Sequence, residues 1–203
     1  MEGKDDLHVV WAICKASGLQ ETFAVEAKAG LSNLQKTAGI LNAALSAPDE
    51  YPGLARGIIL DADQHPQARW QSIRNMLTSK GYLVPDRPDP HGTVLRAEGL
   101  VTFGIWMMPD NQSPGELEDF MRLLIPEQDR LLHHAVESLN RMEAEHIQRY
   151  PAQDRSKALL HTWLAWQEQP GKPMGQSVTA QHFDLQQPVC AAFVHWLKTL
   201  FAA

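Results

Sequence analysis

Short apolar runs rich in branched residues alternate with helical patterns over the first 126 residues. The apolar runs lie at 7–17, 22–27, 57–60 and 101–110, and the helical patterns lie at 31–45 and 66–80. Alternation of this kind is typical of an α/β fold, in which helices cover a sheet. The pattern therefore predicts strands in the apolar runs and an α/β core over 1–126.

Beyond residue 126 the pattern is helical. In the segment 127–150, apolar side chains recur at three- and four-residue spacing, at Leu131, Leu132, Ala135, Val136 and Leu139. The segments 156–168 and 188–201 have helical patterns as well. Because the connections between these helices are short, we expect 127–203 to be a helical extension packed on the core, within one compact unit.

Two aspartates follow the apolar run at 57–60. If this run is a buried strand, Asp61 and Asp63 lie just beyond its end, where open α/β sheets bind their ligands. Side chains alternate along an extended chain, so both carboxylates point to one side, as two oxygen ligands of a divalent cation must. An alternative is that Asp63 or His65 caps the helix that Pro66 begins.

A third acidic group follows the apolar run at 101–110. The spacing of Ser113 and Glu116 predicts a capping box, with Pro114 at the first helical position. The buried face of the helix that follows is expected to consist of Leu117, Phe120, Met121 and Leu124. Capping explains Glu116, and acidic residues at the start of a helix suit its dipole, but Asp110 and Asn111 are not explained in this way.

Acidic clusters thus occur near residues 2, 61 and 110. At strand ends they could converge above one sheet edge and hold one or two Mg²⁺ or Mn²⁺ ions.

Composition limits the classes of protein to which the chain can belong. It has 203 residues, 44% of them hydrophobic, which is enough for a substantial core. The 24 acidic and 18 basic residues give a net charge of −6, and the absence of a Lys/Arg run argues against an extended basic face for duplex nucleic acid. The sequence has no apolar stretch of membrane-spanning length and no signal-peptide pattern at its start, so we expect a cytoplasmic protein that does not bind membranes.

The cysteines and several other residues suggest structural roles. Cys14 and Cys190 lie far apart, form neither a disulfide framework nor a zinc motif, and are expected to be buried as small apolar residues. Other residues with a favoured structural interpretation are His133, His134 and His146 on a helix, the turn-like segment 170–175, and Trp163 and Trp166 in the core.

At this point the residues carry a family resemblance. Glu2 and Gly3, with Asp6 shortly after them and the pair Asp61 and Asp63 behind a hydrophobic strand, resemble the Toprim signature. Toprim domains occur in topoisomerases, DnaG-type primases, ribosomal-RNA maturation nucleases and overcoming-lysogenization-defect nucleases. More closely, the segments at 61–63, 69–70, 104–111, 115–120 and 163–175 are similar to an uncharacterised bacterial Toprim-related family, catalogued as a domain of unknown function. This resemblance covers nearly the whole chain.

The resemblance implies a Toprim-like Rossmannoid fold, with a mainly parallel sheet flanked by helices. It implies that Glu2 is the general acid or base, and that Asp61 and Asp63, joined by Asp6, are metal ligands. The residues that resemble the extra acids of a second metal site are Asp110, Glu116 and Glu118, and the candidate substrate-binding cations are Lys4 and Lys172. In Toprim proteins the glutamate ends a full strand, whereas only Met1 precedes Glu2 here.

Two classes of function follow. The first is a Mg²⁺- or Mn²⁺-dependent enzyme, a nuclease or phosphohydrolase, acting on phosphodiesters or nucleotides. The alternative is a non-catalytic Toprim-like module that binds metal or phosphate and works with a partner protein. The lack of a basic surface favours a nucleotide or single-stranded nucleic acid as substrate, or the second class.

Overall fold

The computed structural model describes residues 4–20, 22–26, 33–46 and 55–201. Its elements are α1 (Lys4–Ala16), α2 (Asn33–Ser46), β1 (Arg56–Asp61), α3 (Pro66–Ser79), β2 (Thr93–Leu95), β3 (Phe103–Met108), α4 (Leu117–Leu123), α5 (Arg130–Ala144), the short 3-10 helix η1 (Ala152–Asp154), α6 (Arg155–Ala165), α7 (Met174–Thr179) and α8 (Pro188–Phe201). Among these described helices, none has both the length and the apolar character needed to cross a membrane.

The described strands form a three-stranded sheet in the order β1-β3-β2. β1 and β3 are parallel, and their register places Asp61 opposite Met108. β2 pairs with β3 in the antiparallel direction. The fold is therefore α/β as predicted, but the sheet formed by the described strands is small and mixed rather than mainly parallel.

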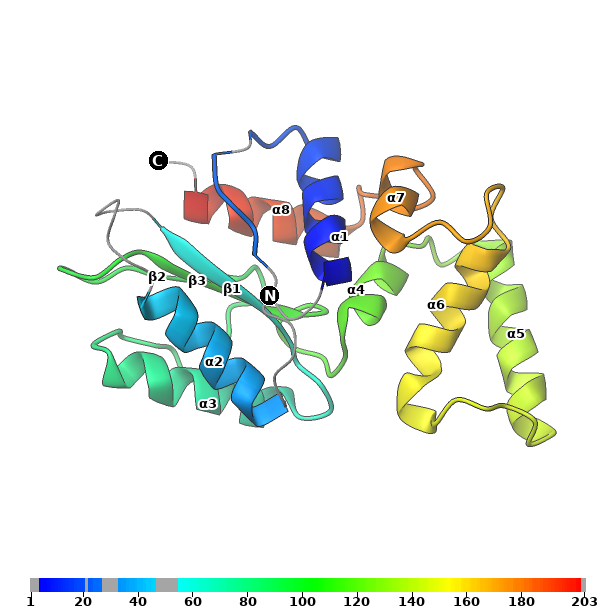
Figure 1. Cartoon of the computed structure of the whole chain (residues 1–203), viewed down its shortest axis with the longest axis horizontal. Helices are drawn as coiled ribbons and strands as arrows, with labels where there is room; N and C mark the ends of the chain where they lie inside the picture. The colour runs from blue at the N-terminus through cyan, green and yellow to red at the C-terminus, as the bar shows by residue number, and fades with distance from the viewer. Residues whose placement is uncertain (1–3, 21, 27–32, 47–54, 202–203) are drawn as a thin grey trace.

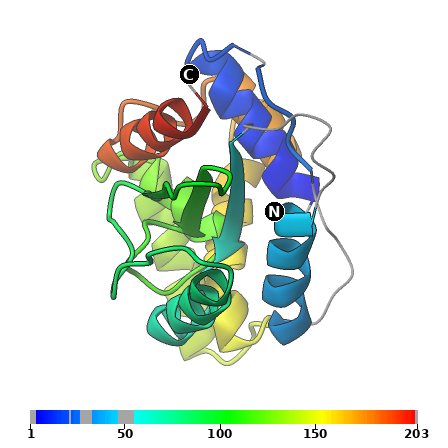
Figure 2. The same cartoon turned by 90° about the vertical axis from the view of Figure 1, so that its left-hand side faces the viewer.

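Helices cover both faces of this sheet (Figures 1 and 2). Every residue of β3 is buried, as expected for a central strand between two helical layers. Ile105 and Met107 belong to one apolar cluster with buried residues of α2 and α3, whereas Trp106 and Met108 belong to the cluster that includes α1 and α8. Because side chains alternate along a strand, β3 joins the two halves of the core.

The cluster on the α1 and α8 side has aromatic side chains at its centre. The ring of Trp106 lies 5.0 Å from that of Phe193 and 5.8 Å from that of Trp196, centroid to centroid. Glycine at position 104 lets α8 approach the sheet, because a Cβ atom there would lie 2.4 Å from a methyl carbon of Leu200.

The remaining helices extend the molecule beyond the sheet. α5 and α6 pack side by side at one end of the molecule, and α4 lies between them and the sheet (Figure 1). Buried residues of α4, α5, α6 and α7 belong to the same apolar cluster as α1 and α8. The helices after residue 126 thus pack on the sheet through a continuous core.

Two of the predicted strands are wrong. The run at 7–17 lies mostly in helix α1, where the buried residues Val9, Val10 and Ile13 follow helical rather than alternating spacing. The described part of 22–27 is irregular, although the Phe23 ring stacks on those of Trp11 and Phe201. Strands at 57–60 and within 101–110 are confirmed by β1 and β3, and the short β2 was not predicted.

Both cysteines are buried, as predicted. Cys14 lies on α1 and Cys190 on α8, in the shared apolar cluster. Burial raises the pKa of each thiol to about 11, so both thiols are protonated near neutral pH.

The packing of α8 against the loop before β2 predicts a difference between two glycine substitutions. Gly92 has φ +91°, and a Cβ atom there would lie 2.4 Å from the ring of Trp196. Gly99 has φ +74° but nothing within 4 Å. We expect Gly99→Ala to lower the free energy of unfolding by about 1 kcal/mol through backbone strain, and Gly92→Ala by about 1 to 3 kcal/mol more through overpacking. Urea unfolding at pH 7 measures both values, and equal losses would contradict the packing described.

Candidate functional site

The carboxyl ends of β1 and β3 form one edge of the sheet. Asp61 is the last residue of β1 and is half-buried. The next residue, Ala62, donates its backbone N–H to the carbonyl of Met108 at 3.0 Å. The structure therefore brings Asp61 and the loop that contains Asp110 to the same edge, which we call the carboxyl edge.

Asp63 lies on a turn rather than on a continuation of the strand. Its φ is +53°, in the left-handed region. It is held there by two backbone hydrogen bonds with Gly115: the Asp63 N–H donates at 3.0 Å and the Gly115 N–H donates at 2.8 Å. The alternation expected for Asp61 and Asp63 thus stops at Asp61, because the backbone turns to pair with the loop after β3.

A nearly buried arginine holds this turn. Arg69 of α3 donates from Nε to the carbonyl of Asp61 at 2.9 Å and from Nη2 to Oδ2 of Asp63 at 2.6 Å. Only 9% of the Arg69 side chain is exposed, against 34% for Asp63. The guanidinium therefore balances carboxylate charge at the carboxyl edge. Helix α3 begins at Pro66 as predicted, but the N-cap residue His65 makes no side-chain capping hydrogen bond.

Asp110 orders the loop after β3. Its Oδ1 accepts the backbone N–H groups of Gln112 at 3.0 Å and Ser113 at 2.7 Å, and its Oδ2 accepts the Ser113 hydroxyl at 2.8 Å. The neighbouring Asn111 is buried and accepts the backbone N–H of Met107 at 2.8 Å. Helix capping did not explain Asp110 and Asn111 in the sequence. The structure shows that both side chains stabilise the turn at the end of β3.

The capping box lies three residues later than predicted. Helix α4 has Glu116 as its N-cap, and the Glu116 N–H donates to Oδ2 of Asp119 at 2.9 Å. Ser113 does not cap the helix, because its hydroxyl and N–H bind Asp110. The predicted buried face is confirmed for Leu117, Phe120, Met121 and Leu124.

The first turn of α6 contacts this capping box. Lys157 Nζ lies 2.5 Å from Oε2 of Glu116, and the Ser156 hydroxyl donates to Oδ1 of Asp119. The hydrogen bond with Glu116, with further attraction from Glu118, raises the pKa of Lys157 above its ordinary value. Glu118 itself is buried. Among the described residues, Lys157 and Arg69 are therefore the cations paired with the acidic cluster, and neither was among the predicted site residues.

The remaining predicted site residues are only partly described. Glu2 lies outside the described residues. Lys4 and Asp6 lie in the first turn of α1, and Lys172 lies in the connection between α6 and α7. Within the described part of the chain, no group of three or more His, Cys, Asp or Glu side chains is arranged to hold a metal ion.

The favoured structural interpretations hold with two exceptions. All three histidines are exposed, but only His133 and His134 lie on a helix, because α5 ends at Ala144 and His146 lies in the turn that follows, with φ +54°. The segment 170–175 runs through the connection into the start of α7. Trp163 is buried in the core with 2% exposure, as predicted. Trp166 is 44% exposed at the C-cap of α6, so its assignment to the core was wrong.

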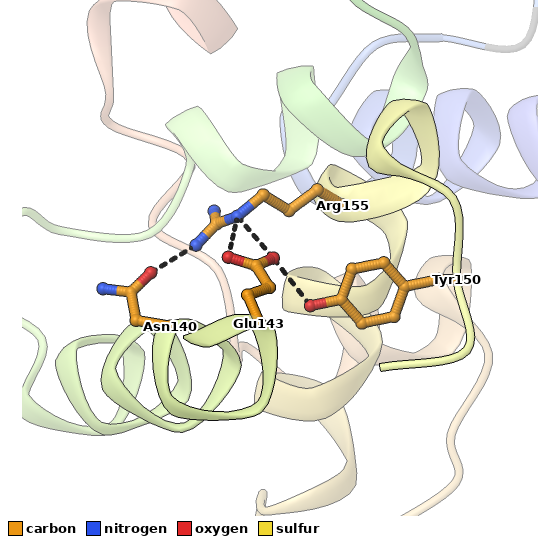
Figure 3. Close-up of polar contacts among 4 residues, drawn as sticks. All are labelled: Asn140, Glu143, Tyr150 and Arg155. Carbon is orange, nitrogen blue, oxygen red and sulfur yellow. Dashed lines mark hydrogen bonds and ion pairs between the residues drawn. The ribbon is translucent and has the colours of Figure 1, made fainter. Parts of the chain in front are cut away.

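A second polar cluster joins the ends of α5 and α6 (Figure 3). Oε1 of Glu143 accepts the Tyr150 hydroxyl at 2.8 Å and Nε of Arg155 at 2.9 Å. Nη2 of Arg155 also donates to Oδ1 of Asn140 at 2.7 Å. All four side chains pair within the α5–α6 hairpin, so this cluster has a structural role.

The environment of Arg69 predicts a large effect of its loss. We expect Arg69→Met to lower the free energy of unfolding by about 2 kcal/mol, because a nearly buried charged hydrogen bond is removed. The matched control is Arg74→Met on the same helix, which breaks an ion pair with Asp86, a side chain that is 87% exposed. In this control the free energy of unfolding should fall by less than about 1 kcal/mol. Urea unfolding measures the loss in free energy of unfolding for both variants. Similar losses would mean that Arg69 contributes no more to stability than the exposed ion pair of Arg74.

The α5–α6 cluster predicts a pH-dependent stability. The Tyr150 hydrogen bond, and after it Arg155, lowers the pKa of Glu143 below its ordinary value of 4.5. The stabilisation from this carboxylate is thus present above pH 4.5 and is lost as the pH falls through the lowered pKa. We expect Tyr150→Phe to destabilise the protein at pH 7 and to have a smaller effect at pH 3.

Tyr82→Phe provides the control for this pH series. The Tyr82 hydroxyl donates to the backbone carbonyl of Val101 at 2.8 Å, which does not titrate. The effect of Tyr82→Phe on the free energy of unfolding in urea should therefore be the same at pH 3 and pH 7. An equally pH-independent effect of Tyr150→Phe would argue against the Glu143 linkage.

Comparison with known proteins identifies the family of this chain. No curated protein and no solved structure matches the chain significantly. The family model described as "Protein of unknown function (DUF3226)" matches residues 1–202. This match confirms the predicted domain of unknown function over almost the whole sequence, and the chain belongs to the DUF3226 family.

Proposed function

We propose that this protein is a Mg²⁺- or Mn²⁺-dependent enzyme of Toprim-like type that acts on phosphodiesters or nucleotides at the carboxyl edge. One observation carries the proposal: Asp61 ends β1 in register with Met108, the last residue of the parallel strand β3. Ligands of open α/β sheets bind outside the carboxyl ends of such strands. This register supports the proposal that a substrate and its cation meet at Asp61 and the neighbouring Asp63.

The donor set fits a hard divalent cation. Mg²⁺ is commonly held by one or two carboxylates, with water and substrate phosphate as the other ligands. Asp61 and Asp63 supply two carboxylates, and a carboxylate that binds an arginine through one oxygen keeps further lone pairs for a metal. When bound, the cation would stabilise negative charge on the attacked phosphate and on the leaving oxygen.

The residues around the pair have distinct proposed roles. Arg69 holds Asp63 and limits repulsion between the carboxylates. Glu2 accepts or donates the proton, and Asp6 adds a ligand from the first turn of α1. Lys4 and Lys172 bind substrate phosphate. The net charge of −6 favours a nucleotide or a single strand over a duplex as substrate.

Three other carboxylates are weaker candidates for a second metal. Asp110 already accepts three hydrogen bonds within its loop, and Glu116 is the N-cap of α4 and the partner of Lys157. Glu118 is buried in the first turn of α4. These pairings favour one metal ion over two.

The same pairings support an alternative function. A Toprim-like module that binds metal or phosphate without catalysis, together with a partner protein, needs fewer available carboxylates than an enzyme does. Metal binding is expected in both cases, and only turnover separates them.

The metal part of the proposal predicts a change in thermal stability. We expect the Tm of the wild type to rise with Mn²⁺ or Mg²⁺, because a bound cation stabilises the folded state. Asp61→Asn should lose that rise. Asp86→Asn removes an exposed carboxylate from the loop after α3 and should keep the rise. An identical response in all three proteins would contradict a metal site at Asp61.

The catalytic part predicts slow Mn²⁺-dependent cleavage of single-stranded nucleic acid or hydrolysis of a nucleotide. Asp61→Ala should abolish this activity in a folded protein. Glu2→Gln should lower turnover and preserve the Mn²⁺-dependent rise in Tm, because it removes a proton acceptor rather than one of the paired ligands. A screen of single strands, duplex DNA, RNA and nucleotides with no signal above Asp61→Ala would favour the non-catalytic module.

A further inference from the structure

Two consecutive residues of α6 bind the two halves of the capping box that begins α4. Ser156 donates its hydroxyl to Asp119, and Lys157 forms an ion pair with Glu116. Asp119 also accepts the Glu116 N–H through its other oxygen, at 2.9 Å. The first turn of α6 therefore fixes both members of the box.

The capping box is directly joined to the carboxyl edge. Gly115, which precedes the N-cap, exchanges two backbone hydrogen bonds with Asp63. The junction is tight, because a Cβ atom at Gly115 would lie 2.6 Å from Oδ2 of Asp119. A shift of Asp119 would thus move Gly115, and Gly115 would move Asp63 together with its partner Arg69.

Helix α6 is well anchored. Leu160 and Trp163 are buried in the core, and Nε1 of Trp163 donates at 3.2 Å to Asp129, the N-cap of α5. The contacts of Ser156 and Lys157 therefore start from a fixed helix, whereas Asp63 lies on a turn in a left-handed conformation.

We propose that Ser156 and Lys157 are positioning residues of the carboxyl-edge site, acting through the capping box and Gly115 on Asp63. The α5–α6 hairpin is then part of the site, although neither residue contacts Asp63. The role of Asp63 as a metal ligand rests on the proposed function. The mechanical link from α6 to Asp63 rests on the contacts alone.

The test uses the full chain with Lys157→Met, Ser156→Ala and the double variant. Hydrogen exchange of the Asp63 and Gly115 amides, followed by NMR, reports directly on the two bridging hydrogen bonds. We expect exchange at both amides to become about tenfold faster in the double variant, as the loss of charged hydrogen bonds implies. The Mn²⁺ affinity, measured by electron paramagnetic resonance, should fall about tenfold. A fall of this size is typical when residues that support metal ligands without contacting the metal are removed.

Two further variants separate positioning from general stability. Arg155→Met removes an ion pair from the same turn of α6, but on the side that faces α5, and should leave both amides and the Mn²⁺ affinity unchanged. Lys157→Arg keeps the charge and should restore both quantities relative to Lys157→Met.

The outcomes distinguish this inference from the proposed function. Exchange at Asp63 and Gly115 that is no faster in the double variant than in Arg155→Met overturns the positioning role. A wild-type protein that binds no Mn²⁺ overturns the proposed metal site instead, and the exchange rates still decide whether α6 positions Asp63.

Discussion

The parallel pairing of β1 with β3 is the interaction on which the rest of the structure depends. It places the ends of two strands that are far apart in the sequence at one edge. The alternating side chains of β3 then contribute to both apolar clusters, so the same strand connects the two helical layers. Without this pairing, Asp61 and the loop around Asp110 would have no reason to meet.

The carboxyl edge shows how acidic residues can share a small region without being left unpaired. Arg69 binds Asp63, Lys157 binds Glu116, and Asp110 accepts hydrogen bonds from its own loop. Each partner comes from a different part of the fold. The edge is therefore a network of ion pairs and hydrogen bonds, and any cation that binds there adds to existing contacts.

The sequence predicted the features that depend on local pattern. The apolar run at 57–60, the helix at Pro66 and the buried face of α4 followed from composition, proline placement and helical spacing. The run at 7–17 was misjudged because branched residues favour strands, whereas tertiary packing makes it a helix. β2 has only three residues and too little pattern to be recognised.

The partners of the acidic residues could not be predicted in the same way. Arg69 lies a turn inside a helix, six positions after Asp63, and Lys157 is 41 positions after Glu116, so neither pair has the three- or four-residue spacing of helical ion pairs. The capping box was displaced because Ser113 binds Asp110, a competition between hydrogen bonds that only the folded loop decides.

The approach of α8 to the sheet has a consequence for biosynthesis. Leu200 and Trp196 cover the glycine surface of β3, and the ring of Trp106 packs against α8. One face of the sheet is thus covered by a helix from the beginning of the described chain and one from its end. During translation, Trp106 stays without its aromatic neighbours until α8 has left the ribosome, so this layer of the core is completed only after synthesis of the sheet has long finished.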